Sequence, residues 1–539
     1  MYLDGQLYIA HSANGPINLV GKMTNRHGLI AGATGTGKTV TLQVMAETFS
    51  QAGVPCFMAD MKGDLSGISQ TGAMSSFIEK RCPEFGIEDP KFAGCPTRFF
   101  DVYGEQGFPM RTTVSAMGPQ LLARLMELNE IQSGVLNIVF RIADDAELLL
   151  IDLKDLRMML DFVGKNASQF TTQYGNISSA SIGAIQRALM TIESEGGDKF
   201  FGEPAFDVND LLDVDASGKG IMNVLAADKL MLNPKLYSTF LLWLLTELYT
   251  QLPEVGDLPL PKLIFFFDEA HMLFEGTSKA LVDKIEQVIR LIRSKGVGIY
   301  FITQSPTDVP VDILGQLGNR VQHALRAFTP QDQKAVKAAA QTFRANPDFK
   351  TEEAIMELGT GEALVSFLDE KGSPCMVERA KILFPLSQIG AITESQRQEI
   401  RNAAPARIKA YDKFMDRESA FEVLTERYEQ AAKEAEEAAK EAEKEKEKEE
   451  KEKKKAGRGK AIKRTIFGTM IGAVATSFAR SLGTQAAKTI TGGSKKSSSK
   501  SSSKKSSSNS GSILSKAAKT ATTTATRKVT EEILKSILK

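Results

Sequence analysis

The eight residues from Gly32 to Thr39 have types and a spacing that suit one kind of chemistry, the binding of phosphate groups. They read Gly-Ala-Thr-Gly-Thr-Gly-Lys-Thr, a glycine and four intervening positions followed by Gly-Lys-Thr. Glycines let the backbone wrap a phosphate with its N–H groups pointing inward, and a helix that follows adds partial positive charge. We expect Lys38 to reach the β- and γ-phosphates of a nucleotide and the Thr39 hydroxyl to ligate Mg²⁺. The predicted phosphate-binding residues are Gly32, Ala33, Thr34, Gly35, Thr36, Gly37, Lys38 and Thr39.

Two acidic residues, Asp268 and Glu269, directly follow the apolar run 263–267. Such a run predicts a central strand of a parallel sheet, with the two carboxylates at its carboxyl end. Beside a nucleotide, Asp268 would hold Mg²⁺ through water molecules. Glu269 would act as the general base that polarises the water attacking the γ-phosphate. The alternative interpretation is that both acids only cap a buried strand.

A second apolar run, 297–303, ends at the amide Gln304. An amide there can contact both the γ-phosphate and the attacking water, so we expect Gln304 to sense the nucleotide state. Further along, Arg320 and Arg326 are candidates for an arginine that completes the site of a neighbouring subunit. We take Arg320 as the catalytic one, and an ordinary salt bridge is the alternative for each arginine.

The segments around these residues predict alternating strands and helices. Further strands are expected at residues 28–31, 54–60, 98–102, 220–225, 321–328 and 363–367, and helices at 40–51, 235–252 and 278–295. This alternation indicates a mostly parallel α/β sheet, in which ligands bind at the carboxyl ends of the strands. Asp60 ends one predicted strand and Lys62 follows it, so a carboxylate and a lysine lie where ligands bind. Asp60 either orders the site or contacts water near Mg²⁺, and the alternative is a polar cap on the strand.

The pattern changes twice along the chain. From about residue 115 apolar residues recur at helical spacing, which predicts an all-α insertion in the α/β core. Beyond residue 392 a segment rich in Glu, Lys and Ala predicts an exposed helix, single or coiled, and a Ser/Lys-rich tail predicts disorder. The predicted domains are residues 1–114 and 216–392 (the α/β core), 115–215 (the all-α insertion), 393–455 (a charged helical extension) and 456–539 (a basic low-complexity tail).

Charge is distributed unevenly between the body of the chain and its tail. Of the 67 basic and 66 acidic residues, 17 and 2 respectively lie in residues 456–539, so the tail carries +15 and the remainder −14. A basic tail of this kind binds polyanions such as DNA, or an acidic membrane surface, without sequence preference. The four cysteines lack metal-site spacing, which predicts reduced thiols. With neither a secretory signal nor an apolar run long enough for a transmembrane segment, we expect a cytoplasmic location.

The phosphate loop, the strand ending in Asp268-Glu269-Ala-His and the strand ending in Thr-Gln304-Ser-Pro together resemble the HerA-like branch of the HerA/FtsK superfamily of ATPases. Within that branch the chain is similar to the uncharacterised bacterial YjgR group. The resemblance extends over about residues 1–500. It implies a RecA-like P-loop NTPase core with a catalytic glutamate, a sensor glutamine and an arginine finger. It also implies hexameric rings and the translocation of DNA or polypeptide.

We therefore expect an Mg²⁺-dependent ATPase motor that assembles as a homo-hexamer and acts on DNA as a translocase or helicase-like protein. Two other functions remain open at this point. One is an ATP-dependent protein-handling or secretion-coupling pump, and the other is a nucleotide switch with slow hydrolysis.

Overall fold

The computed structural model describes residues 1–274, 279–327 and 329–456. Residues 457–539, which make up all but the first residue of the predicted basic tail, lie outside the described residues. The first compact unit is Met1–Leu424, which contains every residue of the candidate site, and the second begins at Thr425. Among the helices that the structure describes, none combines the length and the apolar character needed to cross a bilayer.

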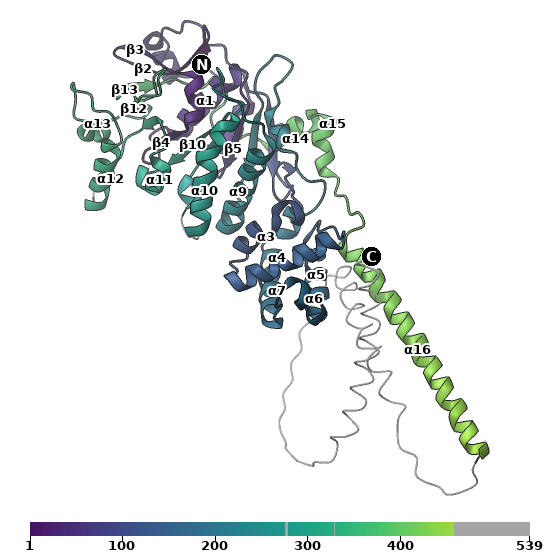
Figure 1. Ribbon diagram of the computed structural model, residues 1–539. Coiled ribbons are helices and arrows are strands. Elements are labelled where there is room, and N and C mark those ends of the chain that lie inside the picture. The colour runs from purple at the N-terminus through teal and green to yellow at the C-terminus, as the bar shows by residue number, and fades with distance from the viewer. Residues whose placement is uncertain (275–278, 328, 457–539) are drawn as a thin grey trace, which may run out of the picture. The chain divides into compact units, whose positions relative to one another are not determined.

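The centre of the first unit is a mixed sheet, shown with its flanking helices in Figure 1. Its strands are Tyr2–Leu3 (β1), Gln6–Ser12 (β2), Gly15–Leu19 (β3), Gly28–Ala31 (β4), Cys56–Asp60 (β5), Thr97–Asp101 (β6), Phe108–Pro109 (β7), Met222–Ala226 (β8), Leu263–Phe267 (β9), Val297–Thr303 (β10), Asn319–Gln322 (β11), Glu362–Ser366 (β12) and Glu378–Ile382 (β13).

The strand order is β1-β2-β13-β12-β11-β4-β10-β9-β5-β8-β6-β7, and β3 pairs with β2. Every pair from β11 to β7 is parallel, whereas the pairs from β11 to β1 are antiparallel. The predicted class, a mostly parallel α/β P-loop NTPase core, is confirmed. Because β4, β10 and β9 are adjacent and parallel, their carboxyl ends meet at one edge of the sheet.

The helices are Lys38–Gln51 (α1), Ser76–Arg81 (α2), Val114–Leu125 (α3), Glu130–Asp145 (α4), Leu153–Lys165 (α5), Ala167–Tyr174 (α6), Ser179–Ser194 (α7), Gly197–Phe200 (α8), Pro234–Gln251 (α9), Lys279–Ile292 (α10), Val311–Leu314 (α11), Pro330–Gln341 (α12), Thr351–Glu357 (α13), Glu394–Ala403 (α14), Ala406–Lys409 (α15) and Ala420–Ala456 (α16). Helices α3 to α8 occupy the chain between β7 and β8, in the stretch where the sequence predicts a helical insertion.

The segment after residue 393 begins within the first unit: the guanidinium of Arg397 lies over the ring of Phe99, and the Ser419 hydroxyl donates to Asp155. The boundary between the compact units accordingly falls at Leu424.

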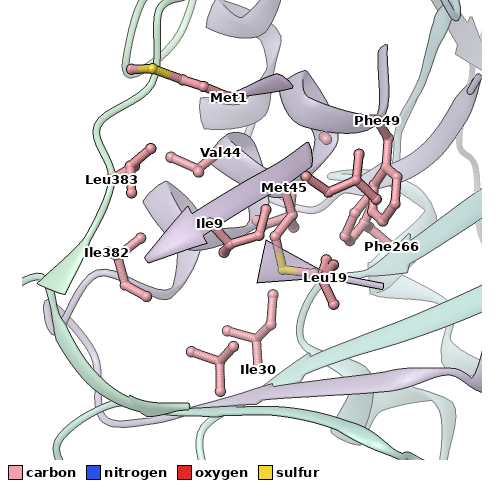
Figure 2. Close-up of a cluster of buried hydrophobic side chains, with 14 of the residues drawn as sticks. Met1, Ile9, Leu19, Ile30, Val44, Met45, Phe49, Phe266, Ile382 and Leu383 are labelled. Atoms are coloured by element: carbon pink, nitrogen blue, oxygen red, sulfur yellow. The ribbon is translucent and has the colours of Figure 1, made fainter. Parts of the chain in front are cut away.

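Helix α1 is anchored by a buried apolar cluster. Figure 2 shows Val44 and Met45 of this helix among side chains from the strands, including Ile9, Ile30 and Phe266. Each of these five side chains is at most 1% exposed. Burying such a side chain contributes about 1.5–3 kcal/mol, so the cluster fixes α1 and with it the loop that precedes the helix.

One predicted strand is shorter than expected. Residues 321–328 read as a strand, whereas β11 ends at Gln322. The chain leaves the sheet there because His323 turns toward the phosphate loop, and the Ala324 carbonyl accepts a hydrogen bond from the Ala33 amide at 2.8 Å.

Candidate functional site

The phosphate loop connects β4 to α1, and its glycines have conformations that other residues adopt with strain. Gly32, Gly35 and Gly37 have φ values of 155°, 77° and 112°. A Cβ on Gly32 would lie 2.5 Å from the Cβ of His323, so no side chain fits there. Since α1 begins at Lys38, the backbone N–H groups of its first turn lack helical partners and point toward the loop. The loop is therefore shaped to receive phosphate oxygens.

Lys38 lies within this loop. Its ammonium donates hydrogen bonds to the carbonyl oxygens of Gly32 at 2.7 Å and Ala33 at 3.2 Å. Burial lowers the pKa of Lys38, while the charges of Glu269 and Asp268 act in the opposite direction. The two carboxylates are thus close enough to interact electrostatically with this ammonium, and the structure brings the three predicted residues together.

The acidic pair lies at the carboxyl end of β9, where the backbone turns sharply. Glu269 has φ 47° and ψ 49°, a left-handed conformation that costs a non-glycine residue about 1–2 kcal/mol. Along an extended strand, adjacent side chains point to opposite faces of the sheet, and this turn removes that restriction. Burial, and secondarily the charge of Glu269, raises the pKa of Asp268 to about 6. The strained turn therefore lets two consecutive carboxylates serve one pocket.

Lys62, expected from the sequence at a strand end where ligands bind, belongs to this pocket, but its partner there was not predicted. It follows β5, the strand beside β9, and its ammonium lies 2.6 Å from Glu269 Oε1. Burial alone would raise the pKa of Glu269, but the hydrogen bond and charge of Lys62, together with smaller effects that include the charge of Lys38, outweigh burial and the pKa is lowered. The other carboxylate oxygen, Oε2, is buried and has no hydrogen-bond partner in the described part of the chain, and the Nδ1 atom of His271 lies 3.4 Å from it.

Asp60 shapes the turn that presents Lys62. Its Oδ1 accepts hydrogen bonds from the backbone N–H groups of Gly63 at 2.7 Å and Lys62 at 3.3 Å. Burial, followed by the charge of Asp64, raises the pKa of Asp60 to about 7. Of the interpretations of Asp60 from sequence, these contacts with the backbone directly after β5 match the strand cap, and a role toward the nucleotide site stays a prediction.

Gln304 follows β10, which lies between the strand of the phosphate loop and the strand of the acidic pair. Its side chain is exposed at this edge. The preceding residue is fixed on both sides: the Thr303 carbonyl accepts from the Gly32 amide at 3.2 Å, and the Thr303 hydroxyl donates to Asp308 at 2.6 Å. The amide of Gln304 is thus carried by a rigid strand end joined directly to the loop.

His323 packs against the phosphate loop beside Gly32, a contact that the sequence did not predict. Its Nε2 lies 2.7 Å from the Thr41 hydroxyl of α1, and its Nδ1 lies 3.0 Å from the Glu362 carbonyl. Burial lowers the pKa of His323 to about 4, so the ring is neutral near pH 7. A neutral ring whose Nδ1–H donates to the carbonyl leaves Nε2 to accept from the threonine hydroxyl.

The donors at the loop fit Mg²⁺ chemistry. Thr39 stands in the first turn of α1, half-buried, and Asp268 supplies a buried carboxylate. Hydroxyl and carboxylate oxygens are the hard ligands that Mg²⁺ prefers, and P-loop sites complete its coordination with phosphate oxygens and water. Among the described residues no group of three His, Cys, Asp or Glu side chains could hold a metal alone, so these two residues would hold Mg²⁺ together with a nucleotide.

Arg320 is not brought to this pocket. It is the second residue of β11 and aligns with Leu29 of β4, toward the amino ends of the strands. Its guanidinium donates to three backbone carbonyls, those of Leu317 at 2.8 Å, Thr342 at 2.6 Å and Leu314 at 2.9 Å. Within the chain its donors are therefore used to hold neighbouring segments.

The ion pair between Lys62 and Glu269 leads to a testable pH effect. Replacing Lys62 with Met removes the interaction that lowers the pKa of Glu269 while its burial remains, so that pKa should rise. If Glu269 must be ionised for hydrolysis, the acid limb of the pH–rate profile should move to higher pH. The ratio of the hydrolysis rate at pH 6 to the rate at pH 8 should then be lower than in the unaltered chain. The measurement is the ATP hydrolysis rate against pH.

Two variants serve as controls for this experiment. Lys62→Arg keeps the charge and should keep the acid limb near its original pH, and Lys91→Met removes an exposed lysine elsewhere. An acid limb that stays in place in Lys62→Met would show that Lys62 does not control the ionisation of Glu269.

Comparisons with known proteins identify the family of this chain. The family model described as helicase HerA-like, C-terminal, matches residues 6–497. Among solved structures, the bacterial conjugative coupling protein TrwBdeltaN70 is 14% identical with a TM-score of 0.48, covering 72% of this chain and 91% of its own. VirB4 of Thermoanaerobacter pseudethanolicus is 13% identical with a TM-score of 0.44, covering 72% of this chain and 97% of its own. No curated protein matches the chain. The assignment to the YjgR group stays a prediction, but the family model spans nearly the whole sequence, and the chain belongs to the HerA-like helicase C-terminal family.

Proposed function

We propose that this protein is an Mg²⁺-dependent ATPase motor of the HerA/FtsK type that works on DNA as a homo-hexamer. The observation that carries the proposal is the convergence of Lys38, Asp268 and Glu269 at one edge of the sheet, from segments more than two hundred residues apart. A lysine on a glycine loop beside two carboxylates is the arrangement that phosphoryl transfer to water requires.

Each residue of the pocket would have its own role in ATP hydrolysis. Lys38, now hydrogen-bonded to two loop carbonyls, would turn its ammonium to the β- and γ-phosphates. Glu269 would accept a proton from the attacking water, and Gln304 would orient that water from the neighbouring strand end. Mg²⁺, held by Thr39 and through water by Asp268, would neutralise phosphate charge when bound.

The pairing of Lys62 with Glu269 supports a gated version of this mechanism. A base whose pKa is held down by a lysine at 2.6 Å is a weak base, so hydrolysis would require Lys62 to release Glu269. The Lys62 side chain is 57% exposed, which leaves it free to move, and the negative γ-phosphate is the partner it would move to.

An arginine that acts across subunits is part of the proposed hexamer. Arg320 was the predicted residue, but its guanidinium is engaged by three backbone carbonyls. Arg326 is exposed and follows the segment that hydrogen-bonds the loop, so it suits this role better.

The test is the ATP hydrolysis rate of the full chain with and without single- and double-stranded DNA, together with its mass in solution. A DNA motor should show a hexameric mass and hydrolysis stimulated by DNA, with the stimulation falling steeply as salt rises. Hydrolysis indifferent to DNA but raised by vesicles or a protein partner would favour the secretion-coupling pump. Very slow turnover with tightly retained ATP would favour the nucleotide switch.

A further inference from the structure

A cavity of about 660 Å³ lies at the opposite edge of the sheet from the phosphate loop. Its walls include Arg26 and His27, which precede β4, Gly318, which precedes β11, and Arg293, which precedes β10. Helices α10 and α11, labelled near each other in Figure 1, contribute further residues. The intervening strands are four to seven residues long, so the cavity is on the order of 13–23 Å from the nucleotide edge. It is therefore a separate site.

The cavity is strongly basic although the body of the chain is acidic. Four arginines and one acidic residue line it, which gives a net charge of +3 because His27 is neutral near pH 7. The lining charged residues are Arg26, Arg290, Arg293, Arg320 and Asp312. Burial lowers the pKa of His27 to about 4. Its hydrogen bond to a backbone carbonyl acts in the opposite direction, and the charges of nearby arginines add to the lowering. Positive charge concentrated on the lining of a cavity suits an anionic ligand.

The arginines in the cavity are incompletely paired. Arg26 has an acidic neighbour, Asp257, only at 4.0 Å, and its Nε is buried with no hydrogen-bond partner in the described part of the chain. Arg293 is exposed and lies near enough to Arg26 that, after burial, this like charge lowers its pKa. Arg290 pairs with Glu286 one turn away on α10, an exposed contact of little stabilising value. Guanidinium groups are thus available to a ligand.

The other lining residues indicate which part of a nucleic acid would fit. Ser366, Thr342 and Gln316 also line the cavity. Both hydroxyl groups donate to backbone carbonyls within the chain, and the Gln316 amide, which donates to the Asp312 carbonyl, keeps a second N–H. No Phe, Tyr or Trp belongs to the lining in the part of the chain that the structure describes. Bases stack on aromatic rings, whereas phosphates take arginine, hydroxyl and backbone donors.

We propose that this arginine cavity binds the phosphodiester backbone of a DNA strand, without reading its sequence. The proposal rests on the DNA-motor function proposed above for its choice of nucleic acid over other phosphate carriers. Arginine recognises phosphate through paired N–H donors, and several guanidinium groups converging from different segments match the successive charges of a strand. The cavity thereby provides a second, polymer-binding site on the edge of the sheet opposite the ATP site.

The test measures binding of a labelled single-stranded oligonucleotide to the full-length Arg290→Gln/Arg293→Gln variant by fluorescence anisotropy over a range of salt. Both side chains are exposed, so the variant should fold normally. Affinity should fall at least tenfold. The slope of log affinity against log salt should become shallower by about 1.4, because each phosphate contact with a single strand contributes about 0.7. ATP hydrolysis without DNA should be unchanged.

The matched control is Arg141→Gln/Arg187→Gln, which removes two exposed arginines from α4 and α7, outside the cavity. Arg141 also pairs with an acid one turn away, as Arg290 does. Because the basic tail is present in every variant, a difference between the two double variants reports the cavity alone. The control should bind DNA as the unaltered chain does.

Three results would overturn the proposal. The first is an unchanged DNA affinity in the cavity variant, and the second is an equal loss of DNA affinity in the control variant. The third is displacement of the oligonucleotide by ATP, pyrophosphate or polyglutamate as effectively as by unlabelled DNA. Binding and hydrolysis are read separately, so the two proposals fail independently. If DNA binds through the cavity but does not stimulate ATP hydrolysis, the proposed motor function is contradicted. If DNA stimulates hydrolysis but the cavity variant binds DNA normally, the proposed DNA-binding role of the cavity is contradicted.

Discussion

Replacing Glu269 with Gln should stop ATP hydrolysis and leave ATP binding intact. Glutamine keeps the size of the side chain and its ability to orient water, but it cannot accept a proton. Removal of a general base typically costs a factor of 10²–10⁴ in rate. Glu269 reaches the pocket through a strained left-handed turn, and its pKa is lowered by the adjacent Lys62, so it is ionised near pH 7. Steady-state hydrolysis and equilibrium ATP binding are the two measurements.

Two comparisons make this result specific. Glu286→Gln changes an acid on α10 outside the pocket and should hydrolyse ATP at the normal rate. Lys62 would lose its ion-pair partner in Glu269→Gln, so a melting experiment without nucleotide should confirm that the variant is folded. Hydrolysis at more than a tenth of the normal rate in Glu269→Gln would remove Glu269 from the role of base.

The sequence predicted the parts of the site that follow from the phosphate loop and the strand ends. The strands 28–31 and 263–267 were predicted with the bounds that the structure has. Polar residues at the ends of β4, β9 and β10 meet because these strands are parallel neighbours, with Ala31 opposite Thr303 and Phe267 opposite Phe301. Parallel pairing is itself predictable from alternating strands and helices, and the proximity of Lys38 to Glu269 follows from it.

The order of the strands and the backbone strain at Glu269 could not be predicted from the sequence pattern. Nothing in the local sequence places β5 beside β9, so the contact between Lys62 and Glu269 was not predicted. Glutamate has no preference for the left-handed region, and only the folded structure imposes it on Glu269. Arg320 was predicted to complete the site of a neighbouring subunit, but β11 starts only one residue earlier, so Arg320 lies toward the amino end of the strand. At the amino edge, Arg26 before β4, Arg293 before β10 and Arg320 within β11 line one cavity, although they are far apart in the sequence.

Replacing Lys38 with Ala should abolish ATP binding together with hydrolysis. Around the loop, the acidic side chains that act on the Lys38 ammonium are Glu269, Asp268 and Asp308. Without the ammonium, these carboxylates would face the phosphates with one cation fewer in a partly buried pocket. We expect ATP affinity to fall at least a hundredfold, which corresponds to about 2.7 kcal/mol.

Thermal unfolding with and without Mg²⁺-ATP distinguishes a loss of ATP binding from a loss of hydrolysis alone. A ligand at a hundred times its Kd stabilises the folded state by about 2.7 kcal/mol, so Glu269→Gln should melt at a clearly higher temperature with ATP, whereas Lys38→Ala should show no shift. Lys38→Arg serves as the geometric control. Its charge is kept, but its planar guanidinium is too large for a loop in which the ammonium lies 2.7 Å from the Gly32 carbonyl, so it should fail as Lys38→Ala does. Full stabilisation of Lys38→Ala by ATP would place the nucleotide outside this loop, and the assignment of the pocket would then be wrong.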